Sequence, residues 1–402
     1  MTLLRTDAAE LVAERLDQLL AEGDPKAIEP EVFLGRQFDL GLAWVAFPIG
    51  RGGLAAPASL QRVVDRRLSA AGAPRALLRN AVGIGLVVPT LAVHGTDGQL
   101  DRHLRPTFTG EEIWCQLFSE PDAGSDLAAL RTEAVRDGDE WVVTGQKVWT
   151  SLAQRARFGL LLARTDREVP KHRGISAFIV DMQARGVEVR PLRQMTGDAE
   201  FNEVFLSGVR VPDSARIGDV GDGWNVGRTT LMNERVLLSG GGGGPTNVGG
   251  NRIERLLDVV RAGRFELRPV DRDRLTRLYI ESQVIKQTNL RARAAREAGR
   301  PVGPEGSITK LMQGVHNRRL QEFAVNLHGP AATAWRLSDT DTDAVVRGFL
   351  RAQANTIEGG TSDVLRNVLG ERVLGLPREP DPDRNRSWND ALHAARAVRT
   401  GA

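Results

Sequence analysis

The chain has 402 residues, of which 41% are hydrophobic and 26% charged, values that are ordinary for a globular protein with a substantial core. Its 54 basic and 51 acidic residues nearly cancel, which gives no reason to expect a nucleic-acid partner. The single cysteine, Cys115, excludes an intrachain disulfide, and no apolar run has membrane-spanning length. With acidic residues near its start and no signal-like apolar core, the chain is expected to be cytoplasmic, without membrane insertion.

Residues 1–113 are predicted to form a helical domain. Apolar residues recur at helical intervals in 9–20. The apolar run 40–48 ends in a glycine-rich turn, and a second apolar helix is expected over 76–93. Residues 100–108 are expected to begin the passage out of this domain.

In residues 114–222 the hydrophobic period changes toward two, which is typical of strands. Glycine and aspartate turn signals separate the apolar runs, as in a compact sheet domain. The β-like runs are 141–143, 158–162, 175–180, 187–189 and 203–206.

Helical periodicity returns in residues 223–376, and the tail 377–402 is expected to end in one short peripheral helix. The run GGGGGP at 240–245 can hold no regular structure and matches no glycine-rich phosphate motif. The expected helices cover 224–238, a long segment capped by Asp271 and stopped by Gly299 and Pro301, 305–327, 342–354 and 362–374.

This order of helices, strands and helices predicts an α+β fold in which two helical domains flank a small sheet domain. It argues against a doubly wound nucleotide-binding fold, in which strands and helices would alternate.

One motif, SEPDAGSD at residues 119–126, can form a concave site for an anionic oxygen. Pro121 restrains the chain, and Gly124 lets the backbone approach a bulky partner. Ser125 offers a hydroxyl beside neighbouring N–H groups. The alternative is an ordinary surface turn.

The second motif, GQKVWTS at residues 145–151, places a flat indole, Trp149, beside the hydroxyls of Thr150 and Ser151. A flat ring system with a pyrophosphate tail would need both motifs. Read alone, a Trp after a Gly turn is more often a core anchor than a cofactor platform.

Together, in this order and spacing, the two motifs resemble those of the acyl-CoA dehydrogenase family, FAD-dependent enzymes that desaturate thioesters. The resemblance extends in collinear order over roughly residues 30–380 and includes MTGDAEFNEVFLSGVRVP at 195–212. It implies an N-terminal helical domain, a middle β-barrel or sheet domain and a C-terminal four-helix bundle. It also implies FAD, an acyl-CoA substrate, electron-transferring flavoprotein as the electron acceptor, and a dimer or tetramer.

Desaturation needs a base for the α-proton, donors to the thioester carbonyl and a hydride acceptor that only a cofactor can supply. By resemblance, Ser125 and Arg235 also contact the substrate. The FAD contacts implied in the same way are Phe118, Ser119, Gly124, Ser125, Trp149, Thr150, Ser151, Thr361 and Asp363.

The family places the catalytic base, a glutamate, at either of two positions, and the sequence has a candidate near each. Glu358 lies in TIEGGTSD, one residue before the expected position. Glu234 directly precedes Arg235 on the first C-terminal helix and needs no shift, so it is favoured. Alternatively, Glu234 and Arg235 form an exposed surface pair, and Glu358 is an acid at a helix start.

Two family motifs that complete the FAD site across a subunit boundary are altered. Residues 261–266, RAGRFE, lack the expected arginine and the final glycine, and residues 326–330, NLHGP, keep one glycine. Either a homo-oligomer or a hetero-oligomer is therefore expected, the latter with a partner chain that supplies the missing contacts. No histidines occur at metal spacing, so no metal is expected; His94, His103 and His328 are interpreted as capping or core residues.

Three functions remain open. The first is an acyl-CoA dehydrogenase of lipid catabolism that forms a trans-2-enoyl-CoA. The second is a flavin-dependent oxidase or hydroxylase of the same fold, and the third is a non-catalytic subunit of a hetero-oligomeric dehydrogenase. The sequence does not define the acyl group.

Overall fold

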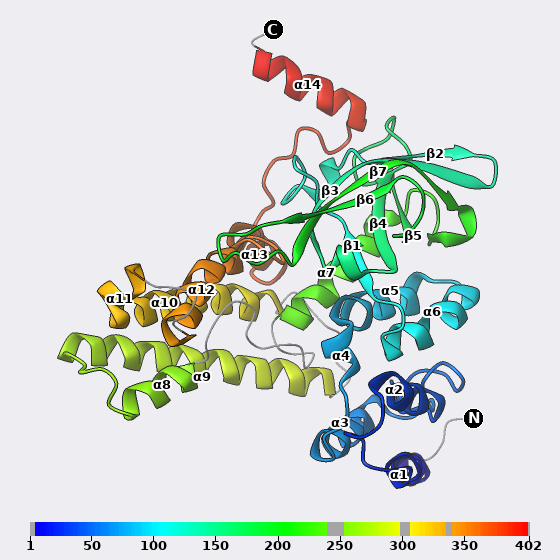
Figure 1. Cartoon of the computed structure of the whole chain (residues 1–402). Helices are drawn as coiled ribbons and strands as arrows, with labels where there is room; N and C mark the ends of the chain where they lie inside the picture. Colours follow the sequence, from blue (N-terminus) through cyan, green and yellow to red (C-terminus); the bar gives the residue numbers. More distant parts are fainter. Residues whose placement is uncertain (1–4, 239–252, 298–305, 335–339, 401–402) are drawn as a thin grey trace. The chain divides into compact units, whose positions relative to one another are not determined.

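A computed structural model describes residues 5–238, 253–297, 306–334 and 340–400. The chain divides into two compact units, the first comprising Met1–Leu192, Ala199–Asn233 and Asp381–Ala402, and the second Arg193–Asp198 and Glu234–Pro380. In chain order, helices are followed by strands and then by helices, which confirms the predicted α+β fold class (Figure 1).

The N-terminal elements are α1 (Arg5–Ala21), α2 (Pro30–Asp39), α3 (Gln61–Ala70), α4 (Ala76–Arg79), the π-helical turn η2 (Gly83–Val87), α5 (Val88–His94) and α6 (Asp97–Thr109). In α1, Val12, Leu16 and Leu19 are buried at helical spacing, as predicted. Residues 100–108 were expected to leave the helical part, but they lie inside α6. A Thr96–Gln99 capping box precedes that helix.

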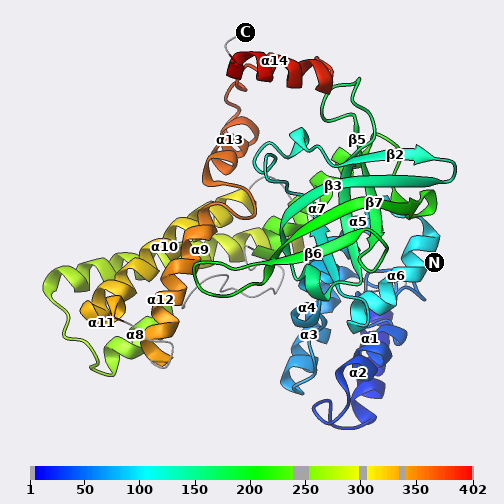
Figure 2. The same ribbon diagram turned by 45° about the horizontal axis from the view of Figure 1, so that its top comes forward.

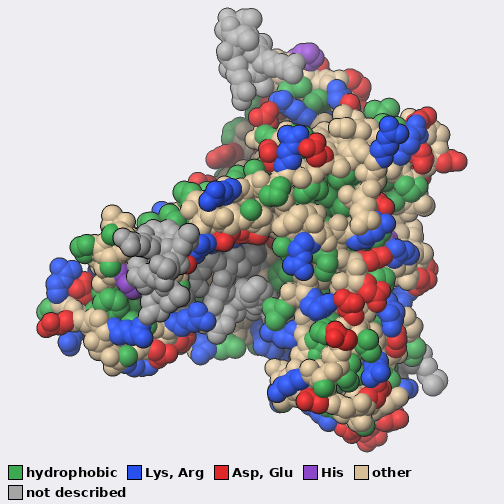
Figure 3. Space-filling view, in the orientation of Figure 1, with side chains coloured by type: hydrophobic (Ala, Val, Ile, Leu, Met, Phe, Trp, Pro, Cys, Tyr) green, Lys and Arg blue, Asp and Glu red, His purple; other side chains and the backbone are tan. Residues whose placement is uncertain are grey.

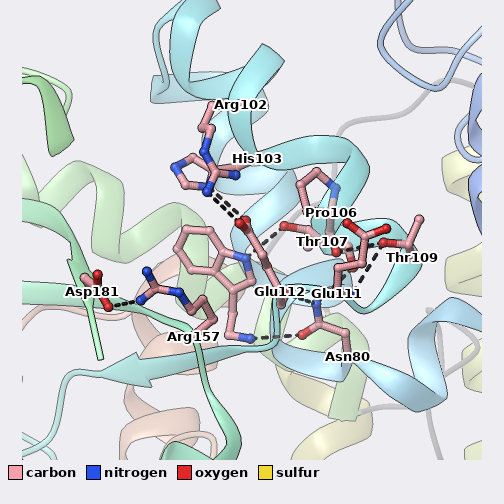
Figure 4. Close-up of polar contacts among 11 residues, drawn as sticks. Asn80, Arg102, His103, Pro106, Thr107, Thr109, Glu111, Glu112, Arg157 and Asp181 are labelled. Carbon is pink, nitrogen blue, oxygen red and sulfur yellow. Dashed lines mark hydrogen bonds and ion pairs between the residues drawn. The ribbon is translucent and has the colours of Figure 1, made fainter. Parts of the chain in front are cut away.

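The second predicted helix of this region is interrupted by Asn80, a fully buried residue between α4 and α5 (Figure 4). Its side-chain oxygen accepts hydrogen bonds from the backbone N–H groups of Gly83 (3.1 Å) and Trp114 (3.2 Å). Its side-chain nitrogen donates to the carbonyls of Thr107 and Glu112, both at 2.9 Å. Because asparagine competes for backbone partners in this way, it ends α4 and joins the helices to the first strand.

One sheet follows, built from β1 (Trp114–Leu117), β2 (Glu133–Asp137), β3 (Glu140–Ser151), β4 (Phe158–Arg164), β5 (Ile175–Asp181), β6 (Val187–Leu192), β7 (Phe201–Pro212) and β8 (Arg216–Ile217). Its strand order is β6-β7-β3-β2-β4-β5-β8, and β1 pairs in parallel with β4. The long strands β3 and β7 run side by side (Figures 1 and 2). All five predicted β-like runs lie in strands of this sheet.

Both faces of β4 and β5 are buried, so their side chains alternate between two apolar cores. Leu161 and Phe178 belong to one core, and Leu160 and Ala177 to the other. Cys115 is fully buried in the first core, and burial raises the pKa of its thiol. Cys115 is therefore a small buried side chain of the core.

The C-terminal helices are α7 (Gly223–Leu238), which crosses from the first unit into the second, α8 (Ile253–Arg261), α9 (Pro269–Glu297), α10 (Gly306–His328), α11 (Pro330–Thr333), α12 (Thr340–Ala352) and α13 (Ser362–Arg372). The core of the second unit includes Leu256, Leu278 and Phe323. Asp271 is not the cap of α9: it lies in the first turn and accepts a hydrogen bond from Arg268 at 2.7 Å. The glycine-rich loop and the stop signals Gly299 and Pro301 lie outside the described residues.

The tail ends in α14 (Trp388–Thr400), the short helix predicted there, and its part from Asp381 onward belongs to the first unit. Short 3₁₀ turns are η1 (Ala58–Leu60), η3 (Leu127–Ala129), η4 (Ala153–Arg155), η5 (Asp213–Ala215) and η6 (Gln353–Thr356). Within the ranges that the structure describes, no helix combines the length and the apolar character needed to cross a membrane. On the face in Figure 3, basic and acidic side chains are interspersed.

Candidate functional site

The two motifs singled out in the sequence are hydrogen-bonded neighbours in the first unit. The backbone N–H of Val148, in β3, donates to the carbonyl of Ser119 at 2.9 Å. The ammonium of Lys147 donates to the carbonyl of Phe118 at 3.0 Å. The loop after β1, residues 119–131 and hereafter the β1 loop, therefore lies against the end of β3 that carries Trp149.

A buried ion pair fixes the β1 loop. The side chain of Lys147 is fully buried, that of Glu120 is 6% exposed, and their charged atoms lie 2.8 Å apart. The same carboxylate accepts hydrogen bonds from the backbone N–H groups of Arg131 (2.6 Å) and Thr132 (2.9 Å), so it closes the loop on itself.

Burial alone would raise the pKa of Glu120, but the Lys147 charge and the hydrogen bonds outweigh that effect and lower it. Neither residue was singled out in the sequence as structural. The short motifs that contain them, SEPDAGSD and GQKVWTS, give no sign of which charged side chain is buried.

Trp149 is turned out of the sheet by an irregularity in β3. The β3–β7 register shifts between Lys147 and Thr150, and Trp149 adopts φ 61°, a left-handed conformation that is rare for a bulky residue. The indole is 61% exposed and meets the Phe201 ring edge-on, with centroids 6.0 Å apart. It is therefore not a core anchor.

The residues around Trp149 lie in strand β3, whereas the sequence suggested a Trp that follows a Gly turn. Gly145 lies inside β3, where an added Cβ would come within 2.3 Å of the Thr132 hydroxyl oxygen. The Thr150 side chain is 1% exposed, and its hydroxyl has no hydrogen-bond partner in the described part of the chain. Ser151 is half-buried, so it and not Thr150 offers an accessible hydroxyl beside the indole.

The crest of the β1 loop is open. Gly124 and Ser125 are exposed, and a Cβ added at Gly124 would meet no described atom within 4 Å. No described residue therefore requires a glycine there, whereas a ligand that approaches the backbone closely would require one. An accessible aromatic ring, a half-buried hydroxyl and an open loop with serine and backbone donors together fit a flavin nucleotide.

Glu358 lies in the turn after α12, within the second unit. Its carboxylate accepts two hydrogen bonds from Arg351 (2.7 and 3.2 Å) and one from the Asn355 amide (2.7 Å). Gly359 (φ 62°) and Gly360 (φ 93°) are both left-handed, a conformation that strongly favours glycine. Glu358 is thus a fully engaged acid and not a free acid at a helix start.

The predicted cofactor residues that follow have local partners. The Thr361 hydroxyl caps α13 by accepting from the Val364 N–H at 3.2 Å. Asp363 is exposed in the first turn and pairs with Arg366 at 2.7 Å.

Lys310, on α10, holds the same turn from the inside. Lys310 is 5% exposed, and its ammonium donates to the carbonyls of Asn355 (3.1 Å) and Gly360 (2.7 Å). Burial lowers the pKa of Lys310, and the charges of Glu358 and Glu234 oppose that shift. Sequence reasoning missed this residue, whose only signal is a lysine on the buried side of a predicted helix.

Glu234 and Arg235 are both half-buried in the second unit, so they do not form the exposed pair considered above. Burial lowers the pKa of Arg235, while the Glu234 charge raises it and the Arg372 charge lowers it further. Glu234, Glu358 and Lys310 thus share one electrostatic neighbourhood.

The two altered family motifs meet in the second unit. The Phe265 ring contacts the His328 ring edge-on, with centroids 4.9 Å apart. His328 also bonds through Nδ1 to the Ala324 carbonyl at 2.9 Å.

In the first unit, His103 packs against the rings of Trp114 and Phe158. Among the described residues, no group of three or more His, Cys, Asp or Glu could hold a metal ion.

Comparison with known proteins defines the class to which this fold and site belong. Residues 115–209 match the model of the acyl-CoA dehydrogenase middle domain, and residues 221–374 match that of the C-terminal domain. "Acyl-CoA dehydrogenase FadE34" of Mycobacterium tuberculosis is 42% identical over 378 residues, which cover 93% of this chain and 50% of that protein. The chain therefore spans about half the length of this relative.

Two solved structures share the fold over nearly the whole chain. The "Tcur3481-Tcur3483 steroid ACAD" has a TM-score of 0.71 and 29% identity, covering 94% of this chain and 99% of that one. The ChsE4-ChsE5 complex from Mycobacterium tuberculosis has a TM-score of 0.69 and 28% identity, covering 94% and 100%. The chain belongs to the acyl-CoA dehydrogenase family of flavoprotein oxidoreductases.

Proposed function

We propose that the chain catalyses the FAD-dependent α,β-dehydrogenation of an acyl-CoA thioester to the trans-2-enoyl-CoA. The observation that carries the proposal is the exposure of Trp149. This residue adopts a left-handed backbone conformation, and its large apolar side chain lies outside the core, beside the open β1 loop. Because such a conformation costs free energy and exposes apolar surface, a ligand that covers the ring accounts for it.

When bound, FAD supplies the hydride acceptor that no side chain can provide. The residues proposed to hold it are the Trp149 ring, the Ser151 hydroxyl, and Gly124 and Ser125 at the crest of the β1 loop. Backbone groups of Phe118, Ser119 and Thr150 are proposed as further contacts from their family positions. Thr361, the N-cap of α13, and Asp363 in its first turn are proposed on the same ground.

Glu234 is proposed as the base that removes the α-proton. Three hydrogen bonds from Arg351 and Asn355 hold both oxygens of the alternative, Glu358, and fix the direction of its carboxylate within the turn. Half-buried Glu234 needs no shift of register. Arg235 is proposed as a substrate contact from its family position, and Ser125 is proposed separately on the same ground.

For the acyl group, we propose a steroid-type thioester as the first to test, because one structure of the same fold is called a steroid ACAD. We also propose a hetero-oligomer with a second chain of this family. The altered segments at 261–266 and 326–330 support it, as does the name of the matched ChsE4-ChsE5 complex. Electron-transferring flavoprotein is the proposed electron acceptor.

The test is the visible spectrum of the purified protein, recorded without oxygen while a panel of acyl-CoAs is added. Bleaching of the flavin without fast oxygen consumption on readmission of air is expected. Rapid oxygen consumption would instead assign an oxidase. Activity with a second chain that survives both Glu234→Gln and Glu358→Gln in this chain would assign a non-catalytic subunit role.

The base is tested by Glu234→Gln, with Glu358→Gln as the matched variant. Glu234→Gln should slow bleaching by a factor on the order of 10²–10⁴, the usual contribution of a general base. Glu358→Gln should have a much smaller effect, because its carboxylate is assigned to the turn. The reverse ranking would transfer the role of base to Glu358.

A further inference from the structure

The C-terminal tail docks on the loop between β4 and β5 of the first unit. The backbone N–H of Trp388 donates to the Val169 carbonyl at 2.9 Å, and that of Asn389 donates to the Arg167 carbonyl at 3.1 Å. The Asn389 side chain also bonds Glu168. The Trp388 residue is only 6% exposed, so this is a built contact and not a loose end.

Beneath the Trp388 indole lies the guanidinium of Arg164, with its central carbon 4.7 Å from the ring centroid. Arg167 lies at 5.6 Å from the same ring. Arg164 is 2% exposed, and burial lowers its pKa to about 10, so the side chain remains charged at neutral pH. An aromatic face is a favourable cover for such a cation, because it excludes water while still attracting the charge.

The nitrogens of Arg164 bind the end of the β1 loop. Nη2 donates to the Ala128 carbonyl at 2.6 Å, and Nε donates to the Leu130 carbonyl at 3.1 Å. Nη1 donates to the carbonyl of Lys171, whose ammonium pairs with Asp126 at 2.8 Å. The end of the β1 loop is therefore held by Arg164 and also by Lys171, which lies in the β4–β5 loop on which the tail docks.

The β1 loop is consequently fixed by two buried charges, with its open crest between them. Glu120 accepts from the backbone after the crest and is itself paired with Lys147. Arg164 fixes Ala128 and Leu130. Of these two buried groups, Arg164 is the one that the tail covers, through the Trp388 ring.

We propose that the C-terminal tail braces the loop that binds the cofactor phosphates. By covering Arg164, Trp388 fixes the backbone of residues 128–130 and so holds Gly124 and Ser125 in the arrangement that receives the anionic oxygens of FAD. Trp388 is a positioning residue. The identity of the ligand rests on the proposed function, whereas the ordering of the loop does not.

The experiment compares full-length Trp388→Ala, Trp388→Leu and Trp388→Phe with His393→Ala, an exposed residue of the same helix. Amide exchange of residues 129–132, whose N–H groups bond within this loop, is measured on the protein stripped of cofactor. FAD affinity is measured separately by quenching of flavin fluorescence. Trp388→Leu keeps an apolar cover without a π face, so it remains informative if Trp388→Ala does not fold.

In Trp388→Ala and Trp388→Leu, both the exchange rates of these amides and the dissociation constant for FAD should rise about tenfold. Trp388→Phe should restore most of the wild-type values, and His393→Ala should match the wild type. Unchanged exchange in the Leu variant would overturn the brace, and faster exchange with unchanged FAD affinity would overturn its role toward the cofactor. If the wild type alone takes up no FAD, the exchange rates decide the brace, and only a failure to take up FAD with the second chain present as well belongs to the proposed function.

Discussion

Two buried lysines, one in each unit, hold the segments on which the proposed chemistry depends, and they are balanced in different ways. Lys147 is paired with the carboxylate of Glu120 at 2.8 Å and donates to one carbonyl. Lys310 donates to two carbonyls, those of Asn355 and Gly360. In the first unit a buried charge is therefore paired directly with a charge. In the second the ammonium bonds to backbone carbonyls, and the charges of Glu358 and Glu234 act on it electrostatically.

This difference determines what each lysine leaves behind when it is removed. Loss of Lys147 leaves an ionised Glu120 buried without its counter-charge, and an uncompensated buried charge is costly. Loss of Lys310 leaves two carbonyls short of a donor, which is a smaller penalty. The first lysine should thus be essential for stability, and the second mainly for the shape of its turn.

The largest effect is expected for Lys147→Met, which should lower the free energy of unfolding by about 3–5 kcal/mol. Urea denaturation followed by circular dichroism measures it. The matched control is Lys171→Met, which removes a more exposed pair with Asp126 and should cost less than about 1 kcal/mol. The double variant Glu120→Leu with Lys147→Met should recover part of the loss; no recovery would mean that the buried charge is not the cause.

The same pair makes a prediction about pH. In the wild type the pKa of Glu120 is lowered, so its contribution is present at neutral pH and is lost as pH falls through that lowered value. In Lys147→Met burial should raise the pKa of Glu120, so that its penalty is present at pH 7 and disappears on acidification. The stability difference between the two proteins should therefore shrink from pH 7 to about pH 4. A constant difference would contradict this assignment.

The sequence predicted more of the fold than of the site. The strands at 141–143 and 175–180 could be placed because hydrophobic periodicity is a local signal. The break at Asn80 could not, because its partners Thr107, Glu112 and Trp114 are remote in sequence. A local sequence pattern identifies the asparagine but not the distant backbone groups to which its side chain bonds.

For the candidate site, the motifs predicted the location of the site but not the structural or binding role of each residue in it. Both motifs were recognised, yet Lys147 and Glu120 inside them proved to be structural partners. The exposure of Trp149 depends on a register shift between β3 and β7, which only strand pairing defines. Arg164 and Lys310 were missed because their acceptors are backbone carbonyls, which carry no residue signature.

A smaller effect is expected for Lys310→Met, about 1–3 kcal/mol, from the two carbonyls that lose their donor. Thermal unfolding measures the stability. Lys286→Met, on the exposed side of α9, is the control and should change it by no more than about 0.5 kcal/mol. A loss as large as that of Lys147→Met would mean that the charges of Glu234 and Glu358, and not the carbonyls, balance this lysine.

The smallest effect is expected for the ion pair between Arg351 and Glu358, whose side chains are 16% and 23% exposed. A double-mutant cycle with Arg351→Gln and Glu358→Gln should give a coupling energy of about 1 kcal/mol, because water still screens the pair. The corresponding cycle for Lys147 and Glu120 should give several times more, since that pair is almost fully buried. Equal coupling in the two cycles would remove the distinction between the units. A coupling of about 1 kcal/mol would show that Glu358 holds its turn through a partly solvated contact.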